Sequence, residues 1–368
     1  MREIKFPVYA RIALVLIILL AGGYICVIGE RVVVPLLFSF LFAILLLPFA
    51  NFLENKARLS RTLSSIIAIT VLLIIISAVI YVLGAQITDL SSEWPLLKQQ
   101  IVTLFHNLQT WLATTFRLKL EKQTTYINDA TAKLMDSSGV ILQTTLLSLS
   151  SILLFLVFVF IYTILLLFYR RILMRFVVAL CTEKYISIIY DILTNIKQII
   201  RSYISGLFLE AVIVAAVSCL VFLLLGIKYV ILLGLLVGIL NVIPYIGIFT
   251  ALILSVLITF ATYDGRHALF VAIAVIVIHL IDSNFLMPKI VGSKVQLNPL
   301  IVIIGVIIGE MMFGISGMFL SIPFLAIAKV IFDRVDGLQP WGILLGEEEE
   351  TPQKVKRIVR KIKKKESQ

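Results

Sequence analysis

The sequence is poor in charged residues, and this scarcity is the first feature that narrows its class. Charged residues make up only 14% of the 368 residues, whereas hydrophobic residues make up 61%. A soluble domain of ordinary composition has roughly 25% charged and 45–50% apolar residues. Lipid accepts such an apolar excess and water does not, so the composition excludes an ordinary soluble protein and predicts an integral membrane protein.

Cysteine and histidine are too few and too scattered to suggest a cluster. The three cysteines are Cys26, Cys181 and Cys219, and no two of them lie close in sequence. The three histidines are spread in the same way. Disulfide frameworks and zinc sites need such residues at short, regular spacings. We therefore expect neither a disulfide nor a metal site, and we interpret the cysteines as packing residues.

Motifs for the common enzymatic and nucleotide-binding sites are also missing. The chain contains no HExxH, GxSxG, GxGxxG or Walker GxxxxGK[ST] sequence. A protein that hydrolyses ATP needs a loop of the Walker kind to hold the phosphates. We therefore expect a protein that is not an enzyme, has no cofactor and does not draw energy directly from ATP.

Long apolar blocks dominate what the sequence does contain. A bilayer core of about 30 Å needs about 20 apolar helical residues, with about 17 tolerated. The blocks of spanning length are 12–28, 32–50, 63–84, 150–169, 206–226, 229–261, 268–286 and 298–332. The first block follows a basic segment but lacks a small-x-small cleavage site, so we interpret it as a retained helix. We predict an all-α, polytopic helical membrane protein with about eight transmembrane helices.

The distribution of basic residues predicts the orientation. A net charge of +11 would suggest nucleic acid as the partner of a soluble protein, but here the basic residues lie beside apolar blocks. With the N-terminus inside, 24 of the 32 Lys and Arg residues fall on cytoplasmic segments and 8 on the other side. Cytoplasmic loops carry such an excess. We predict a multi-pass protein of a cytoplasmic membrane with both termini in the cytoplasm, and no nucleic-acid partner.

The blocks divide the chain into four regions. They are 1–84 with the N-terminal transmembrane helices, 85–149 as an extracytoplasmic amphipathic insertion, 150–335 as the C-terminal transmembrane core, and 336–368 as a charged cytoplasmic tail. The insertion is either a helix that lies on the membrane or caps an outer vestibule, or a loosely ordered hairpin. Within the core, 182–205 is amphipathic and predicts a helix in the cytoplasmic headgroup plane before the chain turns inward at Gly206. The basic tail predicts attraction to anionic lipid.

Ionisable and polar residues inside apolar blocks are the first candidate sites, because an unpaired charge at bilayer depth is costly. Glu210 lies near one end of its block, where it could also be an interfacial carboxylate in contact with headgroup water. Asp282 and Asn284 end another block, and Lys289 is close enough in sequence to pair with Asp282. Glu310 lies in the middle of a block, either as a functional group or as a hydrated carboxylate at a hairpin tip.

Proline and glycine interrupt 229–261 and 298–332, the two blocks that are too long for one span. We predict hairpins or broken helices there, which are tolerated at membrane depth only where the backbone is buried in protein or lines a water-filled cavity. Transporters use such breaks to hold substrates and ions. The residues assigned to these breaks and to the pathway beside them are Asn241, Pro244, Tyr245, Gly247, Pro288, Gly314 and Gly317. The recurring Gly-x-x-x-Gly spacing indicates either an internal repeat or ordinary small-residue helix packing.

Three stretches of the C-terminal half resemble the autoinducer-2 exporter family of bacterial transporters. They are GLLVGILNVIPYIG (234–247), IDSNFLMPKIVG (281–292) and QLNPLIVIIGVIIGEMMFGISGMFLSIPFLAI (296–327). The family pattern contains I-P-Y-x-G, P-[RK]-[IV]-x-G and F-G-x-x-G-M in the same order. One position differs, because Asp282-Ser283-Asn284 stands where the family usually has Glu-Asn-Asn. The likeness covers about 150–335 by motif and the N-terminal half by hydrophobic layout only.

The resemblance implies export of a small hydrophilic metabolite or signal such as autoinducer-2, and hence a part in quorum sensing. It also implies a homo-oligomer of chains with about eight membrane helices. A sodium/proton antiporter, with Asp282 and Glu210 or Glu310 as proton carriers, is the alternative, so Na⁺ or H⁺ joins a small polar solute and membrane lipid among the expected partners. A membrane scaffold without transport is the alternative of another class, although broken helices and polar groups at depth argue against it.

Overall fold

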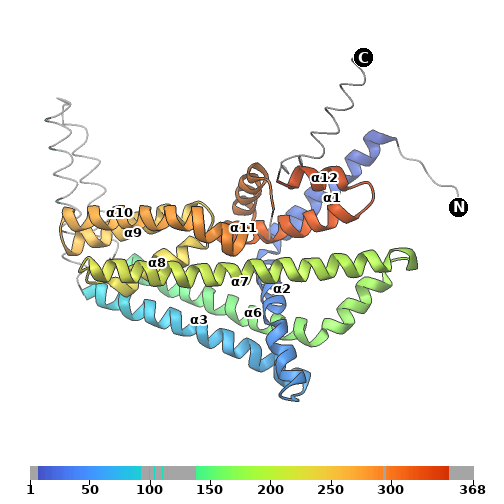
Figure 1. The fold of residues 1–368 in the computed structure, drawn as a ribbon, viewed down its shortest axis with the longest axis horizontal. Helices are drawn as coiled ribbons and strands as arrows, with labels where there is room; N and C mark the ends of the chain where they lie inside the picture. The colour runs from blue at the N-terminus through green and yellow to red at the C-terminus, as the bar shows by residue number, and fades with distance from the viewer. Residues whose placement is uncertain are drawn as a thin grey trace, which may run out of the picture.

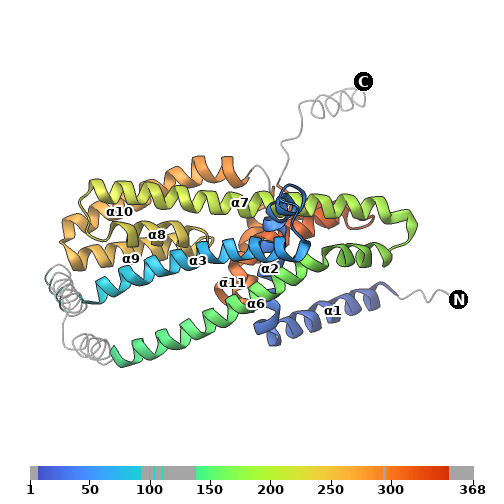
Figure 2. The ribbon, with the colours of Figure 1, turned by 90° about the horizontal axis from the view of Figure 1, so that it is seen from below.

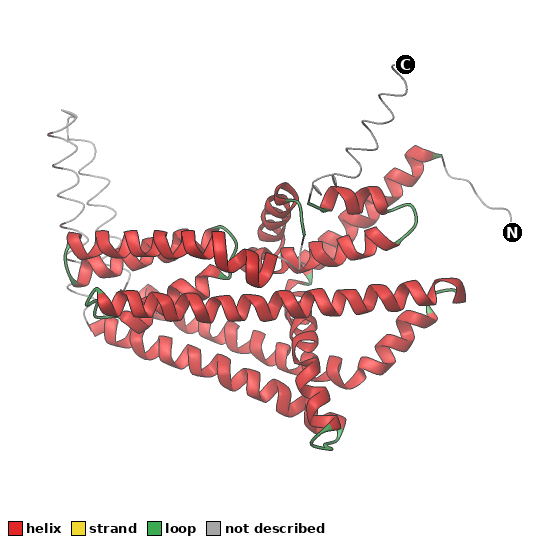
Figure 3. Cartoon of the chain, in the orientation of Figure 1, coloured by secondary structure: helices red, strands yellow, loops and turns green. Residues whose placement is uncertain are grey.

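Helices form almost the whole of the described chain (Figure 1). The computed structural model describes residues 7–92, 138–292 and 296–347, together with the single positions 99, 103, 110 and 114. No strand runs through these ranges (Figure 3). Six of the helices within them are long and apolar enough to cross a membrane. Shorter apolar helices lie at 13–28, 230–241 and 246–262. The predicted all-α, polytopic class is confirmed.

Two predicted regions fall largely outside the described residues. They are most of the insertion at 85–149 and the tail from residue 348 onward. At the edges of the insertion the structure shows regular helix, since one helix continues to Ser92 and the next described helix begins at Ser138. The predictions made for the interior of the insertion and for the tail remain predictions.

Long helices form the N-terminal half. They are α1 (Val8–Ile28), α2 (Glu30–Asn55), α3 (Arg61–Ser92) and α6 (Ser138–Ala179). Gly29 separates the first two, and its amide donates to the Ile25 carbonyl at 2.9 Å. The buried Ser39 hydroxyl of α2 lies 2.6 Å from the Pro35 carbonyl oxygen and 3.1 Å from the Val159 carbonyl oxygen of α6. A buried polar contact therefore joins α2 to α6 in addition to their apolar packing.

The C-terminal half holds more helices and two irregular segments. It consists of η2 (Glu183–Tyr185), α7 (Ile186–Leu224), α8 (Val230–Asn241), α9 (Ile246–Thr262), α10 (Gly265–Ile281), η3 (Asp282–Leu286), η4 (Pro288–Gly292), α11 (Pro299–Arg334) and α12 (Gln339–Leu345). Asp264 caps α10 by accepting a hydrogen bond from the backbone amide of His267, and this bond lowers the pKa of the Asp264 carboxyl. α7 runs along the molecule, with α8, α9 and α10 gathered at one end (Figure 1).

The helices form three packed groups. One core lies among α7, α8, α9 and α10, a second among α2, α7 and α11, and a third among α2, α3 and α6. Seen from below, α7 to α10 stay together while α3 and α6 diverge along their length (Figure 2). α7 belongs to two of the three cores, so it connects the C-terminal group to the N-terminal helices.

α7 is one continuous helix of 39 residues. The turn predicted at Gly206 is wrong, because the helix continues through this buried glycine. Ile192, Ile196 and Ile200 are buried in the core shared with α2 and α11. Part of the amphipathic face of 182–205 therefore packs against protein. Its predicted place in the headgroup plane remains a prediction.

The Gly-x-x-x-Gly spacing of α8 allows close packing on α7. A Cβ at Gly238 would lie 2.6 Å from both the Ala211 carbonyl oxygen and the Ala215 side chain, and one at Gly234 would overlap the Cys219 sulfur. Helices approach this closely only where the facing residues are small. Packing alone therefore accounts for the glycines of α8.

α11 is a broken helix, as predicted for 298–332. Phe313 and Gly314 leave the helical conformation, and Gly314 has φ 57° and ψ −141°. The two halves fold back on each other, since a Cβ at Gly317 would overlap the Gly309 carbonyl. The Ser321 hydroxyl also donates to the Gly305 carbonyl at 2.8 Å. α11 is therefore a helical hairpin whose tip lies at Phe313–Gly314.

Gly317→Ala is expected to lower thermal stability, because the added methyl group must push the two halves of α11 apart. Overpacking of this kind costs about 1–3 kcal/mol. Gly84→Ala is the matched control, since nothing lies within 4 Å of a Cβ built there. The thermal midpoint of each purified variant checks the prediction. A Gly317→Ala midpoint equal to that of the control would show that the hairpin is looser than described.

The predicted orientation can be checked at two exposed lysines. Lys56 follows α2, and Lys228 lies between α7 and α8. In a variant without the native cysteines, we expect a membrane-impermeant maleimide to label Lys228→Cys in intact cells and Lys56→Cys only after lysis. The excess of basic residues on the Lys56 side is the physical reason. The reverse labelling pattern would overturn the orientation.

Candidate functional site

The connection between α8 and α9 is a tight backbone turn centred on Tyr245. The Ile246 amide donates to the Pro244 carbonyl at 2.7 Å, and Tyr245 has φ 61° and ψ −55°. These values describe the rarer, strained form of the γ-turn. Such backbone strain costs of order 1–3 kcal/mol and gathers at functional sites. The break predicted for 229–261 is confirmed at residues 242–245.

Gly247 allows α9 to begin directly behind the end of α8. Its amide donates to the Ile243 carbonyl at 3.1 Å, and a Cβ at this position would overlap the Leu240 carbonyl oxygen. Any residue larger than glycine must therefore move one helix end away from the other. The turn at Tyr245 and the close approach at Gly247 together fix the geometry of the break.

A second irregular segment follows α10. Asp282–Leu286 and Pro288–Gly292 are π-helical. Proline cannot donate a backbone hydrogen bond, so Pro288 contributes to the irregularity. π-helical turns are rare and often lie at functional sites, because the wider turn changes the direction of a side chain. Asp282 is the first residue of this segment and is only 3% exposed.

Three polar side chains from three helices meet beside these two breaks. The Asn241 Nδ2 donates to Asp282 Oδ2 at 2.8 Å and to Glu210 Oε1 at 3.4 Å. Glu210 comes from α7 and is 4% exposed, whereas Asn241 is the last residue of α8. One amide group therefore bridges two buried carboxylates. We call Glu210, Asn241 and Asp282 the carboxylate cluster.

Each carboxylate of the cluster keeps one oxygen without a partner. Glu210 Oε2 and Asp282 Oδ1 are buried and form no hydrogen bond within the described ranges, and His279 Nδ1 is in the same condition. No Lys or Arg side chain of the described chain forms an ion pair with either carboxylate. Buried charges without a counter-charge are costly at membrane depth. The cluster is therefore suited to accept hydrogen bonds or positive charge from a bound species.

A cavity of about 550 Å³ opens beside the carboxylate cluster. Its polar lining residues are Tyr203, Glu210, Asn241, Tyr245, His279, Asp282 and Ser283. The remaining wall is mostly apolar and includes Leu207, Phe249 and Val302. Small-molecule sites typically have volumes of roughly 300–1,000 Å³, apolar walls and a few converging polar groups. Because α7 to α11 all contribute to the wall, a shift of either broken helix changes the shape of this cavity.

Five of the residues predicted from the sequence come together here. Glu210, Asn241, Pro244, Tyr245 and Asp282 all line the cavity. Asn241, Pro244 and Tyr245 belong to one segment, whereas Glu210 and Asp282 are distant in the chain and reach this segment through the packing of α7, α8 and α10.

Other predicted residues lie outside this group. Lys289 is exposed and Asp282 bonds to Asn241 instead, so the suggested Lys289–Asp282 pair is not found. The Asn284 amide is exposed and donates to the Leu280 carbonyl at 2.8 Å. Glu310 is exposed close to the tip of the α11 hairpin. Pro288 belongs to η4 and Gly314 to the break in α11, whereas Gly317 lies in the helical half of α11 that follows the break, and none of the three lines the cavity.

Two cavity residues were missed by the sequence analysis. His279 precedes Asp282 by less than one helical turn, and Tyr203 precedes Glu210 by two turns, so each shares a helix face with its carboxylate. Tyr203 is 3% exposed. The signal was present as polar residues spaced three and seven apart in apolar helices. In the sequence, His279 is one of three scattered histidines and Tyr203 is one residue of an amphipathic face, so neither is marked as part of a site.

Sequence comparison places these features in a known family. Residues 14–337 match the family described as "AI-2E family transporter". This match covers most of the chain and includes the whole carboxylate cluster. The chain belongs to the AI-2E transporter family. As a member of this family it is a multi-pass membrane transporter and not an enzyme.

Individual relatives differ in how much of the chain they match. YhhT of Escherichia coli K12 is 23% identical over 349 residues, which are 90% of this chain and 92% of YhhT. YrrI of Bacillus subtilis is 32% identical over 139 residues, which are 38% of this chain and 39% of YrrI. The AI-2 transport protein TqsA of E. coli K12 is 31% identical over 123 residues, which are 33% of this chain and 36% of TqsA. The chain thus spans about two fifths of YrrI and less of TqsA in these matches.

AI-2E family membership bears on the two alternatives to an exporter, which are a scaffold without transport and a sodium/proton antiporter. A transporter family sets aside the scaffold without transport. None of the three relatives described above carries the name of a cation antiporter, so the comparisons lend the antiporter alternative no support.

Proposed function

We propose that this AI-2E family transporter exports a small hydrophilic metabolite or signal, such as autoinducer-2, through the cavity beside the carboxylate cluster. The relative TqsA is named an AI-2 transport protein, which makes this solute the first candidate. The proposal depends on one observation about the site, which is the pair of unpartnered carboxylate oxygens on Glu210 and Asp282.

Unpartnered carboxylate oxygens favour a solute with several hydroxyl groups. A hydroxyl donates to a carboxylate in a short, charge-assisted hydrogen bond, and two such acceptors select a solute with at least two donors. The apolar wall then packs against the carbon skeleton of the solute, as is common in small-molecule sites. An anionic solute would be repelled by Glu210 and Asp282, and an apolar solute would leave their oxygens unpartnered.

The broken helices supply the parts that can move. Tyr245 and the π-helical segment after Asp282 are irregular backbone that borders the cavity. Irregular backbone at this depth is tolerated only where it is enclosed by protein or lines a cavity. A rearrangement at either break would open the cavity to one side or the other, as alternating access requires.

Counterflow in proteoliposomes tests the solute class. Vesicles loaded with unlabelled autoinducer-2 or another small polyol should accumulate the labelled compound faster than protein-free vesicles. A deoxy analogue of the same size is the control, and we expect it to exchange at least about tenfold more slowly, because a site built to bond hydroxyls is left with unpaired acceptors. Equal exchange of both compounds would show that the carboxylate oxygens do not recognise the solute. The direction of transport is checked separately, by measuring release of the solute into the medium of expressing cells.

A further inference from the structure

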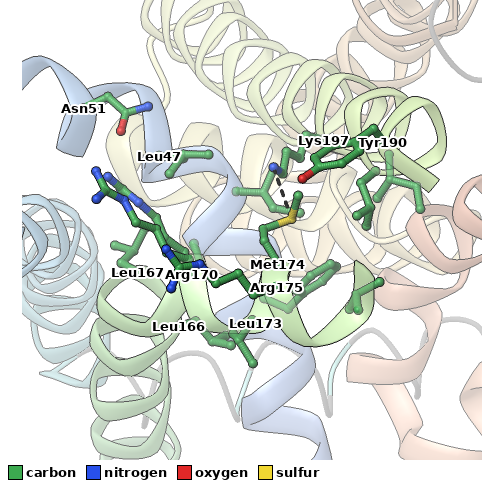
Figure 4. Close-up of a pocket in the computed structure, with 17 residues that line it drawn as sticks. Leu47, Asn51, Leu166, Leu167, Arg170, Leu173, Met174, Arg175, Tyr190 and Lys197 are labelled. Carbon is green, nitrogen blue, oxygen red and sulfur yellow. Dashed lines mark hydrogen bonds between the residues drawn. The ribbon is translucent and has the colours of Figure 1, made fainter. Parts of the chain in front are cut away.

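A second cavity, of about 520 Å³, lies between α2, α6 and α7 and shares no lining residue with the first. Side chains from all three helices surround it (Figure 4). Its apolar lining residues include Phe40, Leu47, Leu166, Leu173 and Val177. Phe40 is 36% exposed and Leu173 is 43% exposed, so the cavity reaches the outer surface of the helices. We call it the α2–α6–α7 cavity.

Basic side chains border this apolar space. Arg170, Arg171, Arg175 and Lys197 line it, and no acidic side chain does. Arg170 is partly neutralised, because its Nη2 lies 2.8 Å from Glu54 Oε2. Its Nη1 is nevertheless buried without a hydrogen-bond partner within the described part of the chain. The rim therefore carries an excess of positive charge.

The other basic groups have no acidic partner within the described ranges. The Lys197 Nζ donates to the Met174 sulfur, which is a weak acceptor, at 3.8 Å (Figure 4). Arg171 and Arg175 are exposed on α6. Protein side chains thus leave these three cations available to an anion from outside the chain.

The sequence around the basic residues predicts that they lie at the level of the lipid headgroups. On α6, Arg170 and Arg171 directly follow the apolar stretch 152–169. On α7, Lys197 precedes the apolar stretch that begins after Ser205. Both helices therefore change from polar to apolar close to the α2–α6–α7 cavity, and this change marks the boundary between headgroups and hydrocarbon.

We propose that the α2–α6–α7 cavity binds one anionic phospholipid. The phosphate lies among Arg171, Arg175 and Lys197, and an acyl chain follows the apolar wall formed by Leu166, Leu173 and their neighbours. Basic pockets between transmembrane helices recognise anionic headgroups in this way. Arginine forks match phosphate oxygens with paired hydrogen bonds. A soluble phosphate would fill only the rim and leave the apolar wall in contact with water.

Native mass spectrometry of the purified full-length protein tests this proposal. Phosphatidylglycerol and phosphatidylcholine with identical chains are the probes, added in turn at equal concentrations. We expect one phosphatidylglycerol to be retained and phosphatidylcholine to be lost. Arg171→Gln combined with Lys197→Gln should weaken phosphatidylglycerol retention at least about tenfold, since each basic residue near the headgroup contributes to binding. Lys228→Gln combined with Arg266→Gln removes the same charge from residues that do not line the cavity and should retain the lipid.

A second variant tests the apolar wall without changing the charge of the rim. Leu166→Trp keeps every basic residue and fills the apolar part of the cavity, so it should also lose phosphatidylglycerol. Equal retention of the two phospholipids by the wild type, or equal retention by the two charge variants, would overturn the proposal. Displacement of phosphatidylglycerol by inorganic phosphate would also overturn it, because it would show a site for a soluble anion.

Discussion

Asp282→Asn is expected to lower solute transport by roughly 10- to 100-fold while the protein still folds and inserts. The carboxylate is 3% exposed, and one of its oxygens has no partner within the described residues. A hydrogen bond to a charged group contributes about 1.5–3 kcal/mol, and about 1.4 kcal/mol corresponds to a factor of ten. Asparagine has nearly the same shape as aspartate, so the Asn241 amide can still donate to the side-chain oxygen of the new residue at position 282.

Counterflow rates of Asp282→Asn and of Lys289→Gln separate the two roles considered for Asp282. Lys289 is exposed and forms no ion pair with Asp282, so Lys289→Gln should transport nearly as well as the wild type. Size-exclusion profiles of both variants show whether they are folded. Wild-type transport by a well-folded Asp282→Asn protein would remove the carboxylate cluster from the mechanism.

Gly247→Ala combined with Pro244→Ala is expected to reduce transport at least about tenfold, because the break between α8 and α9 cannot keep its geometry. A methyl group at 247 overlaps the Leu240 carbonyl oxygen, and forced overpacking costs about 1–3 kcal/mol or more. Removing Pro244 also allows the segment to close into regular helix. Asn241 would then move away from Glu210 and Asp282, since it is the last residue of α8.

Ile246→Ala is the matched control for this variant. Ile246 lies between the substituted positions, is 48% exposed, and contributes its backbone to the turn at Tyr245. Truncating its side chain leaves that backbone bond in place, so transport should stay close to that of the wild type. If the double variant and Ile246→Ala transport equally well, the break does not take part in the transport cycle.

The two helix breaks could be predicted from the sequence because their causes are local. Pro244 and Gly247 interrupt a block too long for one span, and Gly314 with Gly317 does the same in the other. Proline and glycine act through the backbone of their own segment, so no knowledge of neighbours is needed. The strained conformation of Tyr245 could not be predicted, since tyrosine has no preference for positive φ.

The carboxylate cluster could be predicted only as separate residues. Glu210, Asn241 and Asp282 each stand out in the sequence as polar residues in or beside apolar blocks, but their contact depends on how α7, α8 and α10 pack. Proximity in sequence suggested Lys289 as the partner of Asp282, and the fold supplied Asn241 instead. The helix-breaking role assigned to Gly206 failed for a related reason. A glycine inside a helix can also serve close packing, and the sequence does not distinguish the two uses.

The uninterrupted length of α7 gives the molecule mechanical leverage. At 1.5 Å per residue, the 24 residues that separate Ile186 from Glu210 span about 36 Å of α7. A stiff rod of that length converts a tilt of about 10° at Glu210 into a displacement of about 6 Å at the turn that joins α6 to α7. A small change in the tilt of α7 at the cavity would therefore move the α6–α7 turn by a measurable distance. The distance between two spin labels, one beside Glu183 and one beside Lys56, would follow the transport cycle at positions predicted to lie on the cytoplasmic side of the membrane.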